Sequence, residues 1–202
     1  MRNAYVLTMD KNSDRAICSK NVLEKIGFTV ILFEAIRHKH PVISHRKSMY
    51  AIYEKIIEEE ENKYCYVFED DINTLLNIKL NYIIEYEKLN EDIIYLGCCY
   101  NKGKLIKTDK IINFKPLYKI SDGVRGLHSI AITKEGAKIL KTIFDINRET
   151  ILMDVLLEKY TKTKPLYIIR QDLVSPCHSG HLGIFFQDRR KFKSILDHCK
   201  YY

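Results

Sequence analysis

Three consecutive acids, Glu69, Asp70 and Asp71, are the residues best suited to chemistry, and they directly follow the apolar run 64–68. Carboxylates placed just after a buried strand face the crevice in which open α/β sheets bind their ligands. They repel one another, and in an extended chain Glu69 and Asp71 project to the same side. A divalent cation removes this repulsion, and Mg²⁺ or Mn²⁺ commonly bridges one or two carboxylates to substrate phosphates. The acids therefore predict a metal site, and an acidic turn that caps the following helix is the alternative.

The segments around the acids alternate between strand and helix patterns. Apolar, β-branched runs predict strands over 4–9, 28–33, 64–68, 92–96, 128–133 and 166–170. Apolar residues at helical spacing predict helices over 14–26, 44–59, 73–89, 154–160 and from a Thr133 cap onward. Because strand–helix–strand units build parallel sheets, we expect an α/β fold with a mostly parallel central sheet in a single domain, residues 1–202. The lysine-rich segment 100–122, which contains Pro116, predicts an irregular loop over the site.

Composition narrows the class of protein. An apolar fraction of 46% over 202 residues suits one domain with a real core. No apolar run reaches the ~18 residues of a membrane span, and the first residues turn polar too early for a secretory signal. We therefore expect a cytoplasmic protein, and a membrane-peripheral position or, for a viral protein, the host cytoplasm stays open. The net charge of +7 comes from lysines spread along the chain, which favours a solvated surface over a nucleic-acid stripe. The six cysteines lack a Cys-x-x-Cys pair, which predicts reduced, buried thiols.

Several segments, in order along the chain, resemble glycosyltransferase family 25, which contains bacterial lipooligosaccharide galactosyltransferases and collagen galactosyltransferase-like proteins. The acids at 69–71 match the family's Glu-Asp-Asp motif, and Ser44-His45 resembles its Ser-His pair at the start of the preceding helix. A lone Glu-Asp-Asp is common, but an ordered set of segments is more specific. The other similar segments are 5–15, 27–36, 92–97, 128–137 and 153–157.

The resemblance implies a GT-A type fold and transfer of a hexose, often galactose, from a nucleoside diphosphate sugar such as a UDP-hexose. The acceptor would be a hydroxyl of a glycan or protein, the anomeric carbon would be inverted, and Mn²⁺ or Mg²⁺ would be the cofactor. Residues 1–97 would form the half that binds the nucleotide sugar, and residues 98–202 the acceptor and catalytic half. Inversion needs a base that deprotonates the acceptor and charges that stabilise the departing diphosphate.

Within such a reaction, each of five residues has an expected role. Asp71 would ligate the metal directly, while Glu69 and Asp70 would hold the nucleotide ribose or complete the metal shell through water. Asp154, which precedes a helix, is the candidate base, and a plain helix N-cap is the alternative. His128, at the start of a strand, is the candidate contact to the donor sugar or diphosphate, and a buried core histidine is the alternative.

Arg15, Ser44 and His45 are further candidates for the donor site. Arg15 lies in the first turn of a predicted helix, where backbone amides and a guanidinium together favour an anion or a base edge. A surface salt bridge is the alternative for Arg15. Ser44 and His45 would contact the donor, or would be no more than a helix cap with a buried partner.

Two histidines near the C-terminus, His178 and His181, follow Cys177 at the spacing of a zinc half-site. A full tetrahedral set is missing. We expect instead that one of these histidines completes the catalytic metal shell or contacts the diphosphate, as a late histidine does in many GT-A enzymes.

Two other function classes stay open beside the glycosyltransferase. A nucleotidyl or phosphoryl transferase would use the same acidic strand end with a second pair of carboxylates for two metals. The sequence lacks a Gly-rich phosphate loop ending in Lys-Ser or Lys-Thr, which counts against that class. A non-catalytic module that binds sugar nucleotides or nucleic acid is the third class. We expect a nucleotide-sugar donor and a glycan or protein acceptor as partners, and no nucleic acid.

Overall fold

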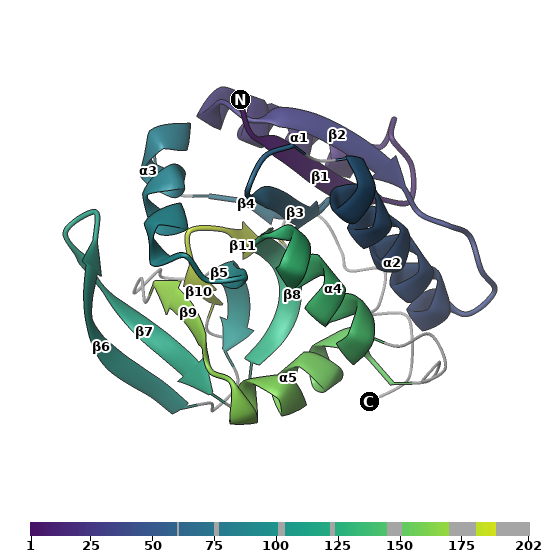
Figure 1. The fold of residues 1–202 in the computed structure, drawn as a ribbon. Coiled ribbons are helices and arrows are strands. Elements are labelled where there is room, and N and C mark those ends of the chain that lie inside the picture. Colours follow the sequence, from purple (N-terminus) through teal and green to yellow (C-terminus); the bar gives the residue numbers. More distant parts are fainter. Residues whose placement is uncertain are drawn as a thin grey trace.

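A nine-stranded sheet forms the centre of the computed structural model, and helices lie on both of its faces (Figure 1). The structure describes residues 1–59, 61–74, 77–100, 104–121, 124–144, 151–169 and 181–188. The strands of this sheet are β1 (Asn3–Thr8), β2 (Thr29–Glu34), β3 (Cys65–Glu69), β5 (Ile93–Tyr100), β6 (Lys104–Ile112), β7 (Lys115–Ser121), β8 (Val124–Ile132), β9 (Leu166–Ile169) and β10 (His181–Gly183). Their order is β2-β1-β3-β8-β5-β9-β7-β6, and β10 also pairs with β5.

Strand direction divides the sheet into two kinds of pairing. β1 runs parallel to both β2 and β3, and β9 runs parallel to β5. β8 runs antiparallel between β3 and β5, and the β6–β7 hairpin extends the sheet antiparallel from β9. The registers place Leu7 beside Glu69 and Thr8 beside Glu34, so β1, β2 and β3 end at the same edge. The predicted α/β class, a central sheet flanked by helices in one domain, is confirmed, whereas the division at residue 97 stays a prediction.

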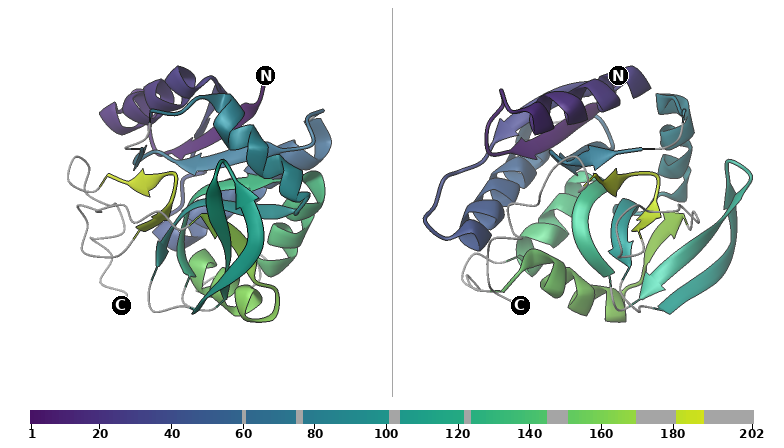
Figure 2. Two further views of the ribbon diagram at one scale, coloured as in Figure 1. Left: turned by 90° about the vertical axis from the view of Figure 1, so that its left-hand side faces the viewer. Right: turned by 180° about the vertical axis from the view of Figure 1, so that it is seen from behind.

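The helices form a layer on each face of the sheet. They are α1 (Asp14–Ile26), α2 (Pro41–Glu59), α3 (Leu80–Ile84), α4 (Lys134–Ile143) and α5 (Met153–Thr163), with a 3-10 helix, η1 (Glu85–Leu89). Viewed from behind, α1 covers β1 and β2, whereas α2, α4 and α5 lie on the front face (Figures 1 and 2). Side chains of β1 alternate accordingly, because Ala4 and Val6 pack with α1 while Tyr5 and Leu7 pack with α2.

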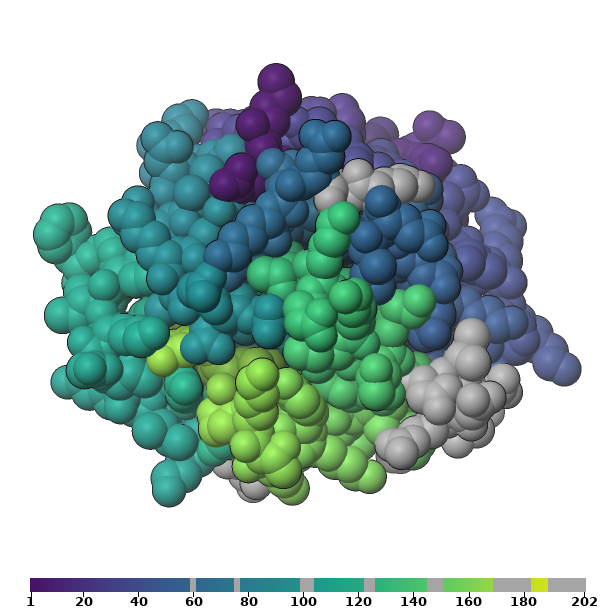
Figure 3. All heavy atoms as spheres, viewed as in Figure 1, coloured from purple at the N-terminus to yellow at the C-terminus, as the bar shows by residue number. Residues whose placement is uncertain are grey.

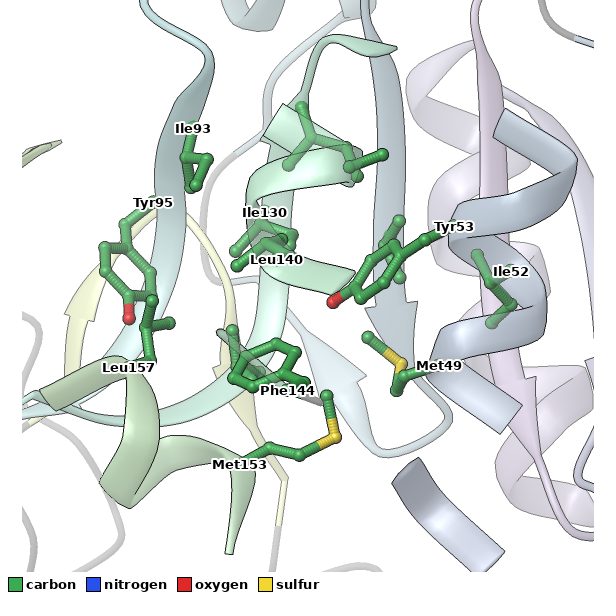
Figure 4. Packing of buried hydrophobic residues seen from close by; sticks show 14 of the residues in the cluster. Met49, Ile52, Tyr53, Ile93, Tyr95, Ile130, Leu140, Phe144, Met153 and Leu157 are labelled. Atoms are coloured by element: carbon green, nitrogen blue, oxygen red, sulfur yellow. The ribbon is translucent and has the colours of Figure 1, made fainter. Parts of the chain in front are cut away.

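The larger apolar cluster lies where α2, α4 and α5 meet the sheet (Figure 4). Tyr53 of α2 and Phe144 after α4 stack with ring centroids 6.4 Å apart. Met49, Ile130 and Leu140 fill the space around them and expose at most 1% of their surface. This packing fixes α2, whose first turns carry His45, against the end of β3.

Local signals in the sequence set the ends of α1 and α4. The Ser13 hydroxyl accepts a hydrogen bond from the Ala16 amide at 3.2 Å, which caps α1. Gly27 ends α1 with a left-handed φ of 118°. The Thr133 hydroxyl accepts a hydrogen bond from the Gly136 amide at 3.0 Å. The predicted helix over 14–26 and the predicted Thr133 cap are confirmed.

Two predicted segments are wrong, and one predicted helix begins earlier than expected. The helix over 73–89 is confined to α3 and η1, because Ile72–Asn73 forms strand β4, which pairs with β11 (Phe186–Gln187) far along the chain. The segment 100–122 is largely the β6–β7 hairpin rather than an irregular loop, since β7 pairs with β9 and β6 with β7. The helix predicted from residue 44 begins at Pro41, a position that suits proline because the first helical amide has no intrahelical partner.

Two further expectations concern the membrane and the cysteines. Across the described ranges, no helix is both long and apolar enough to cross a membrane. Cys65 and Cys98 are buried, as predicted, whereas Cys18 is half-buried. Cys177 and Cys199 lie outside the described residues.

Candidate active site

The acidic residues form a turn between β3 and β4, at the edge where β1 and β3 end. Glu69 is the last residue of β3, and Asp70 and Asp71 make the turn. The turn brings Asp71 to Arg15 together with Asp70, whereas Glu69 contacts His45. The chain does not stay extended here, so the expected common side for Glu69 and Asp71 is wrong.

Asp70 is buried, and both of its carboxylate oxygens accept hydrogen bonds. Arg15 donates to Oδ1 from Nε at 3.0 Å and from Nη2 at 2.7 Å. The Thr8 hydroxyl donates to Oδ2 at 2.7 Å, and the Ser19 hydroxyl donates to the Asp70 carbonyl oxygen at 2.7 Å. Because Thr8 ends β1 and Ser19 lies on α1, Asp70 ties both elements to the turn. The predicted contact of Asp70 with a ribose stays a prediction.

Arg15 is the cation that bridges the two aspartates. Its Nη2 lies 3.2 Å from Asp71 Oδ2 as well as 2.7 Å from Asp70 Oδ1. The Asp71 side chain is 3% exposed and that of Arg15 is 18% exposed, so this ion pair is largely buried. Of the two roles considered for Arg15, the structure shows an ion pair, which is an internal one rather than a surface one. The three carboxylates of the turn against one guanidinium leave a formal charge of −2 when His45 is neutral.

Glu69 is the most accessible acid of the turn, with 25% of its side chain exposed. Its Oε1 lies 3.5 Å from His45 Nε2, and its Oε2 accepts a hydrogen bond from Gln187 Nε2 at 2.7 Å. Burial pushes the pKa of Glu69 upward, but the nearby charges of His45 and His128 and the hydrogen bond from Gln187 outweigh burial and lower this pKa. Glu69 is therefore a carboxylate at neutral pH.

The lowered pKa of Glu69 predicts how stability depends on pH. A carboxyl whose folded pKa lies below its ordinary value near 4.5 stabilises the fold above that value and loses this contribution as pH falls through the folded pKa. The difference in unfolding free energy between wild type and Glu69→Gln should be at its full value near pH 5 and shrink below about pH 4. Urea denaturation of both proteins across this range measures the difference. A difference that grows on acidification would contradict the assignment.

Residues 181–188 complete the site from the far end of the chain. β10 pairs with β5 and β11 pairs with β4, which seats Gln187 against Glu69. The Asp188 amide donates to the Asp71 carbonyl oxygen at 2.7 Å, and Asn73 Nδ2 donates to Asp188 Oδ2 at 3.0 Å. The turn is thus held from both sides, by α1 and by this segment.

His128 is fully buried, with an exposed fraction of 0%, and its Nε2 lies 3.3 Å from the Phe185 carbonyl oxygen. This is the arrangement of the core histidine considered as its alternative role. His128 also acts on Glu69, whose pKa its charge helps to lower. His128 is therefore close enough to Glu69 for their charges to interact, and its predicted contact with the donor stays a prediction.

The remaining predicted residues are Ser44, Asp154, His178 and His181. Ser44 is buried and donates to the Ile36 carbonyl oxygen at 2.7 Å, which ties α2 to the segment after β2. Asp154 lies in the first turn of α5, whose N-cap is Leu152, so the N-cap alternative for Asp154 is wrong. Burial raises the pKa of Tyr95, and the charges of Cys98 and Asp154 raise it further, which places Asp154 near that phenol. The backbone of His181 pairs with Cys99, and His178 lies outside the described residues.

The donor set of the turn suits a metal that arrives with a diphosphate. Within the described part of the chain, no group of three or more His, Cys, Asp or Glu side chains is placed to hold a metal by itself. Mg²⁺ and Mn²⁺, however, are usually held by one or two carboxylates together with substrate phosphates. The excess charge of −2 on the whole turn, counted with His45 neutral, would repel a bare diphosphate and attract a divalent cation. The residues therefore fit a metal site that protein carboxylates and substrate phosphates form together, better than one in which protein side chains supply every ligand.

Comparison with known proteins shows the fold. No model of a protein family matches the sequence, and no curated protein matches it either. Among solved structures, the CTP:phosphocholine cytidylyltransferase from Streptococcus pneumoniae superposes with a TM-score of 0.52 at 14% identity, over 97% of this chain and 100% of that chain.

Two other structures are similar at lower scores. A glycosyltransferase involved in the glycosylation of the major capsid of PBCV-1 has a TM-score of 0.46 at 12% identity, over 73% of this chain and 67% of that chain. A UDP-glucose pyrophosphorylase complexed with UDP-glucose has a TM-score of 0.44 at 12% identity, over 89% of this chain and 74% of that chain. The likeness to the cytidylyltransferase, which extends over nearly the whole of both chains, is one of fold.

Proposed function

We propose that the chain is a metal-dependent inverting glycosyltransferase, similar to family 25, that moves a hexose from a nucleoside diphosphate sugar to a hydroxyl of a glycan or protein. The observation that carries the proposal is the acidic turn at the joined ends of the parallel strands β1 and β3. It combines one accessible carboxylate, Glu69, with an internal pair of acids that Arg15 only partly neutralises. Such a site favours a cation and the diphosphate that the cation carries.

In this reaction the acceptor oxygen attacks the anomeric carbon, the bond from that carbon to the diphosphate oxygen breaks, and the acceptor loses its proton. His45 and Glu69 are suited to take the proton. In the tautomer that carries its proton on Nε2, which lies 3.5 Å from the Glu69 carboxylate, the other ring nitrogen of His45 would accept the proton, and Glu69 would stabilise the imidazolium that forms. Asp154 is the alternative base.

Asp71 would hold the Mn²⁺ or Mg²⁺ directly, and Glu69, which faces His45, would complete the metal shell through water. When bound, the ion would offset the charge that develops on the departing diphosphate. Arg15 keeps Asp70 and Asp71 in place, and Gln187 orients Glu69 by a bond of 2.7 Å. We propose that the donor is a UDP-hexose, whose sugar is identified by incubation with labelled donors. The acceptor is a hydroxyl of a glycan or protein.

Thermal unfolding with uridine and guanosine diphosphates, each with and without Mn²⁺, tests the proposal. Nucleotide at about a hundred times its Kd should raise the Tm by about 5–10 °C, and only when Mn²⁺ is present. Incubation with labelled UDP-hexoses then identifies the donor, by hydrolysis if no acceptor is supplied. Stabilisation by neither nucleotide nor metal would contradict the glycosyltransferase and favour a binding module.

The same assay distinguishes the proposed glycosyltransferase from a nucleotidyltransferase, the class of the structure that superposes over nearly all of this chain. A nucleotidyltransferase predicts stronger stabilisation by nucleoside triphosphates than by diphosphates, and release of pyrophosphate when a sugar phosphate is supplied.

The general base is assigned by comparing two variants at saturating donor. His45→Gln should lose transfer and keep nucleotide binding if His45 takes the proton, and Asp154→Asn should show this pattern if Asp154 does.

A further inference from the structure

The β6–β7 hairpin, residues 104–121, ends in an exposed apolar tip. Phe114 at the tip has an exposed fraction of 101%, and Ile111 beside it has one of 69%. The hairpin projects from one side of the molecule, at the left in Figures 1 and 3. Side chains of this size are usually withdrawn from water, since each buries apolar area worth ~1.5–3 kcal/mol when covered. Their exposure at a projecting tip therefore needs an explanation.

The backbone of the tip makes Phe114 a costly choice for folding alone. Ile112 pairs with Lys115, so the turn has two residues, and both Asn113 and Phe114 have positive φ, 51° and 61°. Such a type I′ turn favours asparagine followed by glycine, and a bulky side chain at positive φ is strained. Strain at one exposed residue points to a role outside the fold.

Contacts of Asn113 and Ile112 hold the turn of the hairpin in place. Asn113 Nδ2 donates to the Tyr82 carbonyl oxygen at 2.7 Å, and Ile112 packs against the apolar cluster beneath. These contacts hold the turn against the α3 region, while Phe114 itself stays outside. The apolar tip is thus presented by a rigid support.

The hairpin is also strongly basic. Its sequence carries five lysines and one acid, Asp109. Lys104, Lys107 and Lys115 are exposed, while Lys110 and Lys119 lie over the Tyr167 ring at 5.1 and 4.6 Å. Lysines on β6 would protect the last strand of the sheet from pairing with another chain. An exposed phenylalanine and isoleucine have the opposite effect, so edge protection does not explain the tip.

We propose that the β6–β7 hairpin docks this protein on an anionic membrane surface. Phe114 and Ile111 enter the boundary between headgroups and acyl chains, and the exposed lysines contact anionic headgroups. An apolar, aromatic tip on a lysine-rich hairpin matches both layers of such a surface, whereas nucleic acid would use the lysines and the Phe114 ring but has no apolar layer for Ile111. The proposal does not depend on the proposed catalytic function.

A tryptophan at the tip tests this directly, because the chain has none of its own. Phe114→Trp should show a blue-shifted emission with vesicles of phosphatidylcholine and phosphatidylglycerol, and the shift should weaken with salt. Ile17→Trp, at a residue of α1 that is 44% exposed, is the matched control and should show none. Lys107→Ala combined with Lys115→Ala, in the Phe114→Trp background, should lower vesicle partitioning by about 25-fold.

Three outcomes would overturn the proposal. They are no shift at the tip with anionic vesicles, an equal shift in the Ile17→Trp control, and a shift that appears without vesicles as protein concentration rises. The last would assign the tip to a second copy of the chain, and a shift produced by an oligonucleotide instead of vesicles would assign it to nucleic acid.

Phe114→Gly separates folding from docking, since it restores the preferred turn. The Tm of this variant should rise by about 2–4 °C while vesicle binding falls to the level of the lysine variant or below. A variant that binds vesicles as well as wild type does would show that Phe114 does not contact the membrane. A variant that is less stable than wild type would show that Phe114 serves the fold.

Discussion

Asp71→Asn is expected to lower the rate of hexose transfer by about a thousandfold while the fold is kept. Asparagine has nearly the same volume, and Arg15 retains its two hydrogen bonds to Asp70 Oδ1, so no buried cation is left alone. The loss falls on the charge that would hold the metal. Transfer from the donor identified by thermal unfolding measures the rate, and urea denaturation measures the fold.

The neighbouring substitution, Asp70→Asn, is the matched control. It removes the charge that accepts both hydrogen bonds from Arg15 and the one from Thr8, so the buried guanidinium loses its main partner. We expect a loss of about 3 kcal/mol in unfolding free energy. The two adjacent acids should therefore separate, one in transfer and one in stability. Undiminished transfer by Asp71→Asn would remove the metal role from this residue.

The sequence alone identifies the first three elements of the fold because their signals are local. β1, α1 and β2 follow from an apolar run, a Ser13 cap and a Gly27 stop, each readable within a few residues. The β6–β7 hairpin escapes prediction since its turn, Asn113-Phe114, lacks the glycine that announces a type I′ turn. β4 escapes because its partner lies more than a hundred residues away.

The same distinction applies to the candidate site. Residue types alone predict a site at the acidic triplet, the family resemblance adds His45, and the structure brings Glu69 and His45 together. Thr8 and Gln187 were missed, as they meet the triplet across 62 and 118 residues of chain and carry no spacing signal. The partner of Arg15 was also unforeseen, because charge repulsion among acids is relieved equally well by a metal or by an internal guanidinium. Sequence shows the repulsion, and only the fold shows how much of it remains.

The segment 181–188 connects the fold to the site, and Gly97 on β5 is the residue that lets it approach. A Cβ at position 97 would lie 2.1 Å from the Phe185 carbonyl oxygen and 2.9 Å from His128 Nε2. The segment cannot retreat freely, because the amides of Ile184 and Phe185 donate to the Leu96 carbonyl oxygen at 2.6 and 3.1 Å. Only glycine leaves room for this contact.

Gly97→Ala should therefore cost about 3 kcal/mol in unfolding free energy and also displace the segment from the acidic turn. Once displaced, Gln187 no longer orients Glu69, so the folded protein should bind the metal–nucleotide pair at least about tenfold more weakly. Urea denaturation and titration calorimetry measure the two effects.

Gly136→Ala is the control, because a Cβ there would lie 2.1 Å from the Asp92 carbonyl oxygen, at the opposite end of β5 from the site. It should lose similar stability and keep its nucleotide affinity. Equal affinities in both variants would mean that the segment supports the fold without shaping the site. A selective loss in Gly97→Ala would tie Glu69 to the C-terminal strands, and with it the part of the site that no local pattern in the sequence announces.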